Sequence, residues 1–100
     1  MTTDDVMIDA LARAFADGVD IISMSIGGTL GWSEDPTAVV ASRLASRGVV
    51  VSIAAGNNGS SGLFEASSPA TGLDAISVGS VDNIANMAWT TTTSDNQSIV

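Results

Sequence analysis

The stretch Gly48-Val49-Val50-Val51-Ser52-Ile53-Ala54-Ala55-Gly56-Asn57-Asn58-Gly59 decides the fold of this 100-residue chain. It begins as a run of β-branched residues and ends in small residues and two amides. Near-continuous apolar runs are typical of strands buried in parallel sheets, and the ligands of open α/β sheets bind beyond the carboxyl ends of such strands. The pattern therefore predicts a buried strand over 49–54 that carries Asn57 to the rim of a parallel sheet.

Helices and strands alternate along the chain, each predicted from hydrophobic spacing and from residues that cap helices. The predicted order is helix 4–17, strand 19–24, helix 36–47, strand 49–54, a long loop rich in Gly and Ser, and strand 75–81. Asp35-Pro36 supplies an N-cap and a first-turn proline for the second helix. Its expected buried face is Val39, Val40, Ala41 and Leu44. This order predicts an α/β fold with a partial three-layer architecture around a parallel sheet.

Both helices are expected on one face of the sheet, because crossovers between parallel strands are right-handed. The opposite face then has no helix to cover it, and an open apolar face of this kind marks an interaction surface. We expect the isolated chain to self-associate through that face or to fold its tail over it. The tail over 86–100 is polar and without a clear period, so we expect it to be weakly ordered or to form one more edge strand.

Composition narrows the possible partners. The chain has only three Lys and Arg residues and a formal net charge of −8, which opposes binding to nucleic acid or to anionic membranes. No apolar run reaches the roughly 20 residues of a membrane span, and the acidic start is unlike a signal peptide. Without Cys there are no disulfides or thiolate metal sites. The whole chain, 1–100, is expected to be one segment of one domain.

Asn57 is the residue best suited to chemistry. A carbonyl carbon under nucleophilic attack gathers charge on its oxygen, and a fixed donor aimed at that oxygen lowers the barrier. A carboxamide on a short arm after a rigid strand offers such a donor and stays neutral at every working pH. The alternative is that Asn57 only forms a turn, a role for which Asn is also favoured.

Two motifs, Asp20-Ile21-Ile22-Ser23-Met24-Ser25-Ile26-Gly27-Gly28 and Val50-Val51-Ser52-Ile53-Ala54-Ala55-Gly56-Asn57, resemble those of the subtilisin-like serine peptidases in order and spacing. The resemblance runs from about Asp4 to about Asp82. It implies that Asn57 donates to the oxyanion and that the segment at Ser25 pairs with the backbone of a substrate peptide. The substrate-binding residues that the resemblance implies are Ser25, Ile26, Gly27, Ala54, Ala55, Gly56, Ser67 and Ala70.

This chain lacks the residues of the family's catalytic triad. The family's triad needs Asp, His and Ser, and this chain has no His and neither of the motifs around the family's Asp and Ser. We therefore expect an internal segment of a secreted endopeptidase's catalytic domain that is inactive alone. No cofactor is expected; relatives often bind calcium, but no metal site is readable in this segment.

Two alternatives come from other classes of protein. Gly56 to Gly62 could cradle a phosphate in a small ligand-binding module, although the GxGxxG fingerprint is lacking and no helix is predicted after this loop. Alternatively, the chain is an interaction protein that uses the open sheet face and the tail. Trp32 is expected to cover the core rather than line a groove.

Overall fold

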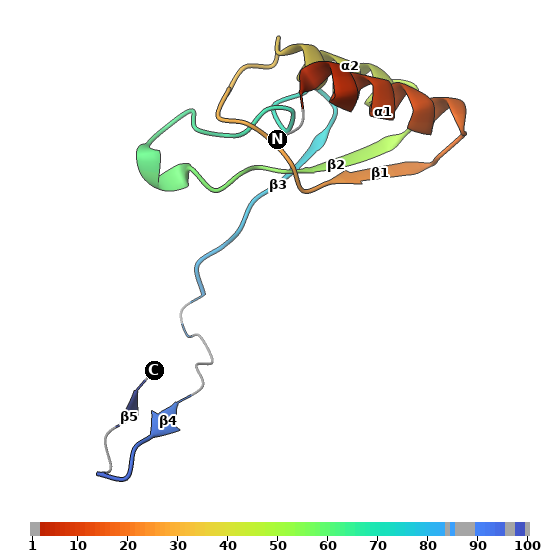
Figure 1. Cartoon of the computed structure of the whole chain (residues 1–100). Coiled ribbons are helices and arrows are strands. Elements are labelled where there is room, and N and C mark those ends of the chain that lie inside the picture. Colours follow the sequence, from red (N-terminus) through yellow and green to blue (C-terminus); the bar gives the residue numbers. More distant parts are fainter. Residues whose placement is uncertain (1–2, 84, 86–89, 96–97, 100) are drawn as a thin grey trace.

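The computed structural model describes residues 3–83, 85, 90–95 and 98–99. Its elements follow the predicted order, with a short 3₁₀ turn in the long loop and two further strands in the tail (Figure 1). They are α1 (Asp4–Ala16), β1 (Ile21–Met24), α2 (Pro36–Ala45), β2 (Val50–Ala54), η1 (Gly59–Ser61), β3 (Ile76–Val78), β4 (Thr91–Thr92) and β5 (Ser98–Ile99).

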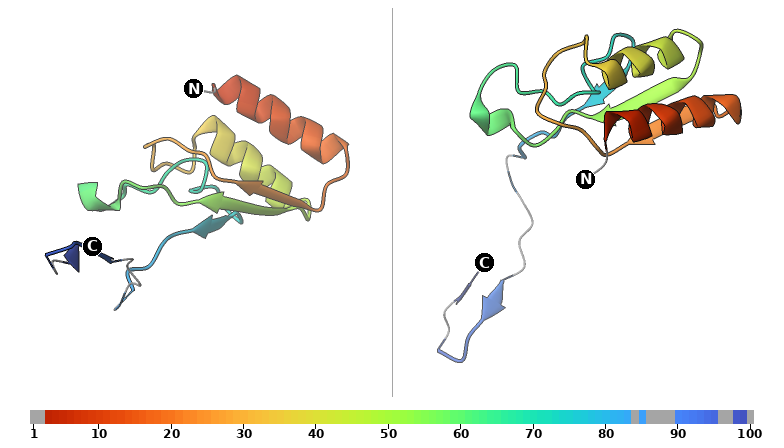
Figure 2. Two further views of the ribbon diagram at one scale, coloured as in Figure 1. Left: turned by 60° about the horizontal axis from the view of Figure 1, so that its bottom comes forward. Right: turned by 45° about the horizontal axis from the view of Figure 1, so that its top comes forward.

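The first three strands form one parallel sheet in the order β1-β2-β3. Ile22 pairs with Val51 and Met24 with Ile53 in the β1–β2 register, so these side chains share one face. Figure 2 shows α1 and α2 side by side over a single face of this sheet. The predicted α/β fold with its helices on one face is confirmed.

The core lies between α2 and β2. Val51 and Ile53 on β2 are each 1% exposed, and they pack with side chains of the neighbouring strand, helices and loop. The buried cluster consists of Leu11, Ile22, Ala41, Leu44, Val49, Val51, Ile53 and Ala70. Because β2 is the central strand and places Val51 and Ile53 in this cluster, its carboxyl end is held firmly where Asn57 follows.

The buried face of α2 differs from the prediction. Thr37, Ala38, Ala41 and Leu44 are buried, whereas Val39 and Val40 are only half-buried. The long loop explains the difference, because a Cβ on Gly72 would lie 2.7 Å from the carbonyl oxygen of Ala38. Such close approach of backbones requires small residues, so the helix turns its alanines inward.

The opposite face of the sheet is open. Ile21 is 65% exposed, Val50 45%, Ile76 53% and Val78 52%. Ile21 pairs directly with Val50, and Ser52 and Ala54 are the partners of Ile76 and Val78 on the same face. The uncovered apolar face expected from the handedness of the crossovers is therefore present.

The tail forms a separate small sheet where it is described. β4 and β5 pair antiparallel, with Thr91 opposite Ile99 and Thr92 opposite Ser98. The turn between them includes a hydrogen bond from the Thr93 hydroxyl to the Asp95 carboxylate. The expectation of a weakly ordered tail or an edge strand falls partly on 86–89, 96–97 and 100, which lie outside the described residues.

Candidate active-site cleft

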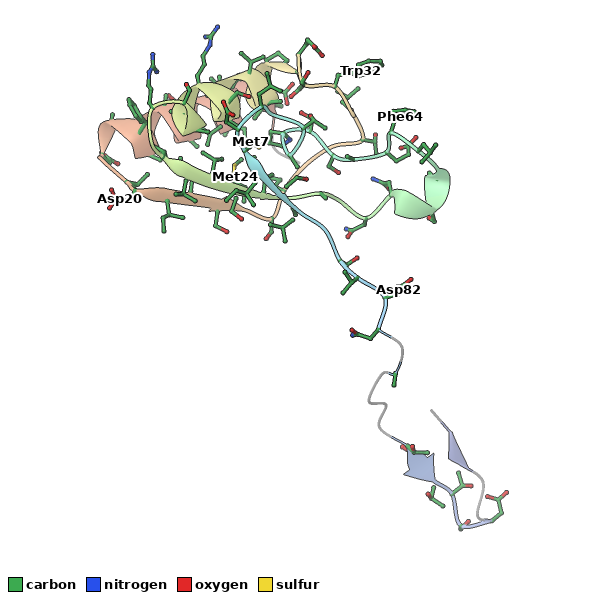
Figure 3. All side chains as sticks on the ribbon, turned by 180° about the vertical axis from the view of Figure 1, so that it is seen from behind. Met7, Asp20, Met24, Trp32, Phe64 and Asp82 are labelled. Atoms are coloured by element: carbon green, nitrogen blue, oxygen red, sulfur yellow. The ribbon has the colours of Figure 1, made fainter. Side chains whose placement is uncertain are left out.

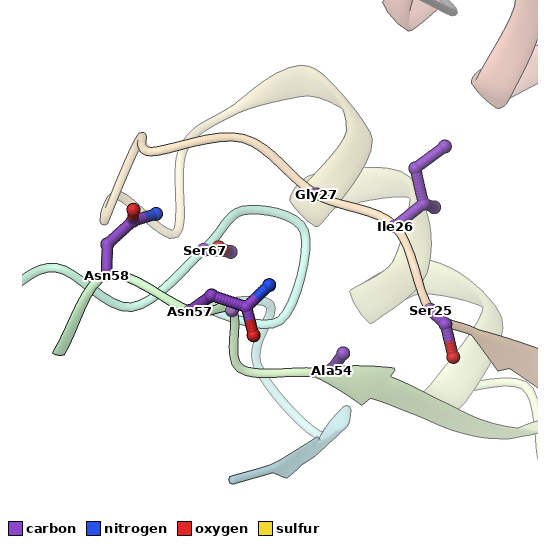
Figure 4. A pocket seen from close by; sticks show the side chains of 8 residues that line it. Ser25, Ile26, Gly27, Ala54, Asn57, Asn58 and Ser67 are labelled. Atoms are coloured by element: carbon purple, nitrogen blue, oxygen red, sulfur yellow. The ribbon is translucent and has the colours of Figure 1, made fainter. Parts of the chain in front are cut away.

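A cavity of about 350 Å³ opens at the carboxyl ends of β1 and β2 (Figure 4). Its lining comes from three segments that are far apart in the sequence: the chain after β1, the chain after β2 and the later part of the long loop. The lining residues are Ser25, Ile26, Gly27, Ala54, Gly56, Asn57, Asn58 and Ser67. The cavity thus lies where an open parallel sheet ordinarily binds its ligand.

Asn57 stands at the mouth of this cavity. It is exposed, it follows β2 by three residues, and its carboxamide points across the open space toward the Ser25–Gly27 segment (Figure 4). The amide is therefore not turned into the packed interior, and the residues before it form a strand rather than a helix. A carboxamide that follows a strand end and faces an open cavity is the kind of donor that can stabilise a developing negative charge.

Gly56 makes the turn that aims Asn57. Its φ of +96° lies in the left-handed region, and a Cβ there would collide with the hydroxyl of Ser67 and come within 2.9 Å of its Cβ. Only glycine satisfies both demands, the backbone angle and the close approach. The turn after β2 is thereby fixed against the far wall of the cavity.

Ser67 forms that far wall. It is 4% exposed, and its backbone N–H donates to the carbonyl of Ala55 at 2.8 Å. The next residue, Ser68, exchanges two backbone hydrogen bonds with Gly28, of 2.9 and 3.0 Å, as an isolated antiparallel bridge. A Cβ on Gly27 would lie 2.7 Å from the carbonyl oxygen of Ser68, so the walls touch with no room for a side chain.

The lining is electrically neutral. None of its eight residues carries an ionisable side chain, and the polar groups that it offers are hydroxyls, amides and backbone groups. Among the residues that the structure describes, no group of three or more His, Cys, Asp or Glu could hold a metal ion, and no helix is long and apolar enough to cross a membrane.

The structure brings together seven of the residues that the sequence singles out: Asn57 with Ser25, Ile26, Gly27, Ala54, Gly56 and Ser67. Ala55 lies beside the lining and supplies the carbonyl that accepts from Ser67. Ala70 lies in the core, where it is 4% exposed. Sequence reasoning missed Asn58 as a lining residue, although its place next to Asn57 was a usable signal.

Trp32 does not cover the core, contrary to expectation. It is 71% exposed and lies with Phe64, which is 91% exposed, at a second cavity of about 380 Å³ (Figure 3). Because Gly31 packs closely against the backbone of Phe64, the two loops meet there and leave both rings at the surface. The remaining lining of this cavity is Thr29, Gly31 and Glu65.

The fold and the cleft together define an α/β protein whose neutral, backbone-lined site lies at the carboxyl ends of parallel strands. A family model described as "Subtilase family" matches residues 1–100, and the chain belongs to that family. Among its relatives, subtilisin-like protease SBT4.15 of Arabidopsis thaliana is 44% identical over 81 residues, which cover 80% of this chain and 10% of the relative.

Two further relatives are also proteases. Subtilisin-like protease SBT1.6 of Arabidopsis thaliana is 42% identical over 64 residues, covering 60% of this chain and 8% of the relative. Minor extracellular protease Vpr of Bacillus subtilis is 37% identical over 78 residues, covering 78% of this chain and 9% of the relative. The chain therefore spans about a tenth of the length of these relatives. No solved structure matches it.

Proposed function

We propose that this chain is the segment of a subtilisin-like serine endopeptidase that supplies the oxyanion donor and part of the substrate cleft. The observation that carries the proposal is Asn57, exposed after β2, with its carboxamide directed into the cavity that Ser25 to Gly27 line from the other side. Membership of the subtilase family supports it.

In this proposal the scissile carbonyl lies beside Asn57. As a nucleophile from elsewhere in the longer protein attacks, the carbonyl oxygen gains negative charge and the Asn57 amide donates to it. The exposed Ser25–Gly27 segment pairs with the backbone of the extended substrate. Neither role requires a cofactor, since amide and backbone groups provide all the hydrogen bonds.

The isolated chain is inactive in this proposal, because it contains no His to act as the general base. With no acidic residue among those that line the cavity, nothing in the lining favours a basic substrate side chain. We further propose that the longer protein acts outside the cell, as the name of the Bacillus subtilis relative says of that protein.

Segment exchange tests the proposal. The matching part of the Bacillus subtilis protease is replaced by this chain's residues, and hydrolysis of a peptide substrate is measured for the exchanged protein and for its Asn57→Ala and Asn58→Ala variants. Asn58 is the matched control, because it is a neighbouring amide that lines the same cavity. We expect activity in the exchanged protein, a large loss of kcat in Asn57→Ala and a small one in Asn58→Ala. Equal effects of the two substitutions contradict the proposal.

The open sheet face supports a second proposal, that the isolated chain self-associates through it. Ile21, Val50, Ile76 and Val78 present neighbouring apolar side chains on this face, together with the small residues Ser23, Ser52 and Ala54. No charged side chain belongs to this set, so two copies can meet there without burying a charge. Sedimentation velocity of the purified chain over a range of concentrations tests it, and a monomer throughout that range contradicts it.

A further inference from the structure

One backbone bridge joins the wall of the cleft that contains Ser25 to Gly27 with the wall that contains Ser67. Gly28, next to the lining residue Gly27, forms its two-way bridge with Ser68, next to the lining residue Ser67. A single bridge contributes two neutral hydrogen bonds, whose net stabilisation in water is modest. Gly28 is also exposed, so water competes for its backbone groups. The bridge alone is a weak way to fix the distance between the walls.

Asp35 reinforces the bridge from outside the cleft. Its Oδ2 accepts the hydroxyl of Ser68 at 2.6 Å, and the same oxygen accepts the backbone N–H of Thr37 at 3.2 Å. Ser68 is 5% exposed and Asp35 is half-buried. Hydrogen bonds to a carboxylate are shorter and about twice as strong as neutral ones, and burial weakens competition from water. The Ser68 side chain is therefore held more tightly than its backbone bridge.

The other end of this connection is rigid. Asp35 is the N-cap of α2, where the helix dipole favours a negative charge. The helix itself is fixed in the core through Ala38 and Ala41, both 0% exposed, and Leu44, 4% exposed. One carboxylate oxygen thus ties the far wall of the cleft to the helix layer.

We propose that Asp35 and Ser68 are positioning residues of the cleft: through the Gly28–Ser68 bridge they hold Ser67 and the Ser25–Gly27 segment at the separation that a substrate requires. This inference rests on the proposed function for its purpose, but the connection itself is measurable without any peptidase activity. Neither residue touches substrate, and both act through the bridge.

Four variants separate the connection from the helix cap. Asp35→Ser keeps a good N-cap but is too short to reach Ser68, and Ser68→Ala removes the donor while leaving the cap untouched. Asp35→Asn retains an oxygen that can accept both bonds and serves as the conservative rescue. Glu34→Gln, a charge change at the adjacent exposed residue, is the matched control.

Amide hydrogen exchange of the ¹⁵N-labelled chain, followed by NMR, measures the bridge directly. We expect the Gly28 and Ser68 amides to exchange about tenfold faster in Asp35→Ser and in Ser68→Ala, as the loss of a bond to a charged group implies. In Asp35→Asn the two amides exchange at a rate between those of the original chain and of Asp35→Ser, because the neutral amide oxygen still accepts both bonds but more weakly. In Glu34→Gln their exchange does not change. The double variant Asp35→Ser/Ser68→Ala exchanges no faster than either single variant, because both remove one connection.

Two results would overturn the inference: unchanged Gly28 and Ser68 exchange in both single variants, or acceleration that spreads equally to the amides of β2. If Asp35→Ser unfolds α2, Ser68→Ala still tests whether the bond between Asp35 and Ser68 stabilises the bridge. The substrate role is measured separately by titrating each variant with an extended peptide and following the Ser25–Gly27 amides. Failure of the original chain to bind any peptide counts against the proposed function, whereas unchanged exchange counts against the connection.

Discussion

The hydroxyl of Ser67 occupies the space that a side chain on Gly56 would need, so the turn that presents Asn57 is built directly against the far wall of the cleft. Gly56 lies at the start of the long loop, and Ser67 lies in its later part. Their contact means that the position of Asn57 depends on the whole loop closing correctly, and not on β2 alone.

Replacing Gly56 with Ala is therefore expected to destabilise the chain by roughly 1–3 kcal/mol, because the new Cβ meets Ser67 and the backbone angle is unfavourable for a side chain. Urea denaturation measures this change in the free energy of unfolding. Gly59→Ala is the control, since a Cβ there meets nothing within 4 Å. Equal stability of the two variants would show that the loop does not close as described.

Leu44 anchors α2 in the core at 4% exposure. Its replacement by Ala removes buried methyl groups and leaves a cavity, so we expect a loss of about 2–5 kcal/mol in the free energy of unfolding. Val6→Ala on α1, where Val6 is 56% exposed, is expected to cost well under half as much. Thermal denaturation of both variants shows which substitution costs more stability. A larger loss of stability in Val6→Ala than in Leu44→Ala would place the core elsewhere.

Val50 lies on the central strand of the open sheet face and is 45% exposed. A lysine at this position would place a charge in the middle of the face, so Val50→Lys is expected to weaken self-association by at least about tenfold. Sedimentation velocity measures the effect. Leu63→Lys, at a loop residue that is 87% exposed, provides the control and should leave association unchanged. The reverse pattern would move the interface to the loop.

Asp5 in the first turn of α1 responds to pH in a defined direction. A hydrogen bond from the Thr3 side chain, followed by one from the backbone of Val6, holds the pKa of Asp5 below its ordinary value of 3.8. Because the folded pKa is the lower one, its stabilising contribution is fully present above pH 3.8 and is lost as the pH falls through the folded pKa. An NMR titration should show this lowered pKa, and Thr3→Val should raise it. An unchanged value would remove the Thr3 contact as its cause.

The sequence predicts the fold well because its signals are local. The β-branched run before Ala54, the Asp35-Pro36 start of α2 and the small residues after each strand act within a few positions of themselves. The buried face of α2 escapes such reasoning, because it depends on Gly72 approaching Ala38 from more than thirty positions away. Hydrophobicity favoured Val39, but the close contact required alanine.

The candidate site likewise has a part that local sequence signals predict and a part that they do not. Asn57 and the Ser25–Gly27 segment each follow a strand, so their meeting at one sheet edge could be predicted from the parallel order. The link between Asp35 and Ser68 joins residues thirty-three positions apart through side-chain oxygens alone. No periodicity or motif reports such a pair. The prediction that Trp32 covers the core was wrong for a related reason, since Gly31 packs against the backbone of Phe64, more than thirty positions away, and Trp32 stays at the surface.

The neutral lining of the cleft has a kinetic consequence. Under the proposed function, the eight residues that line the cavity add no ionisation of their own to the pH–rate profile of an enzyme that contains this segment. Each limb of such a profile would then report groups outside this lining, while the proposed contribution of the Asn57 amide stays constant from acid to alkaline solution.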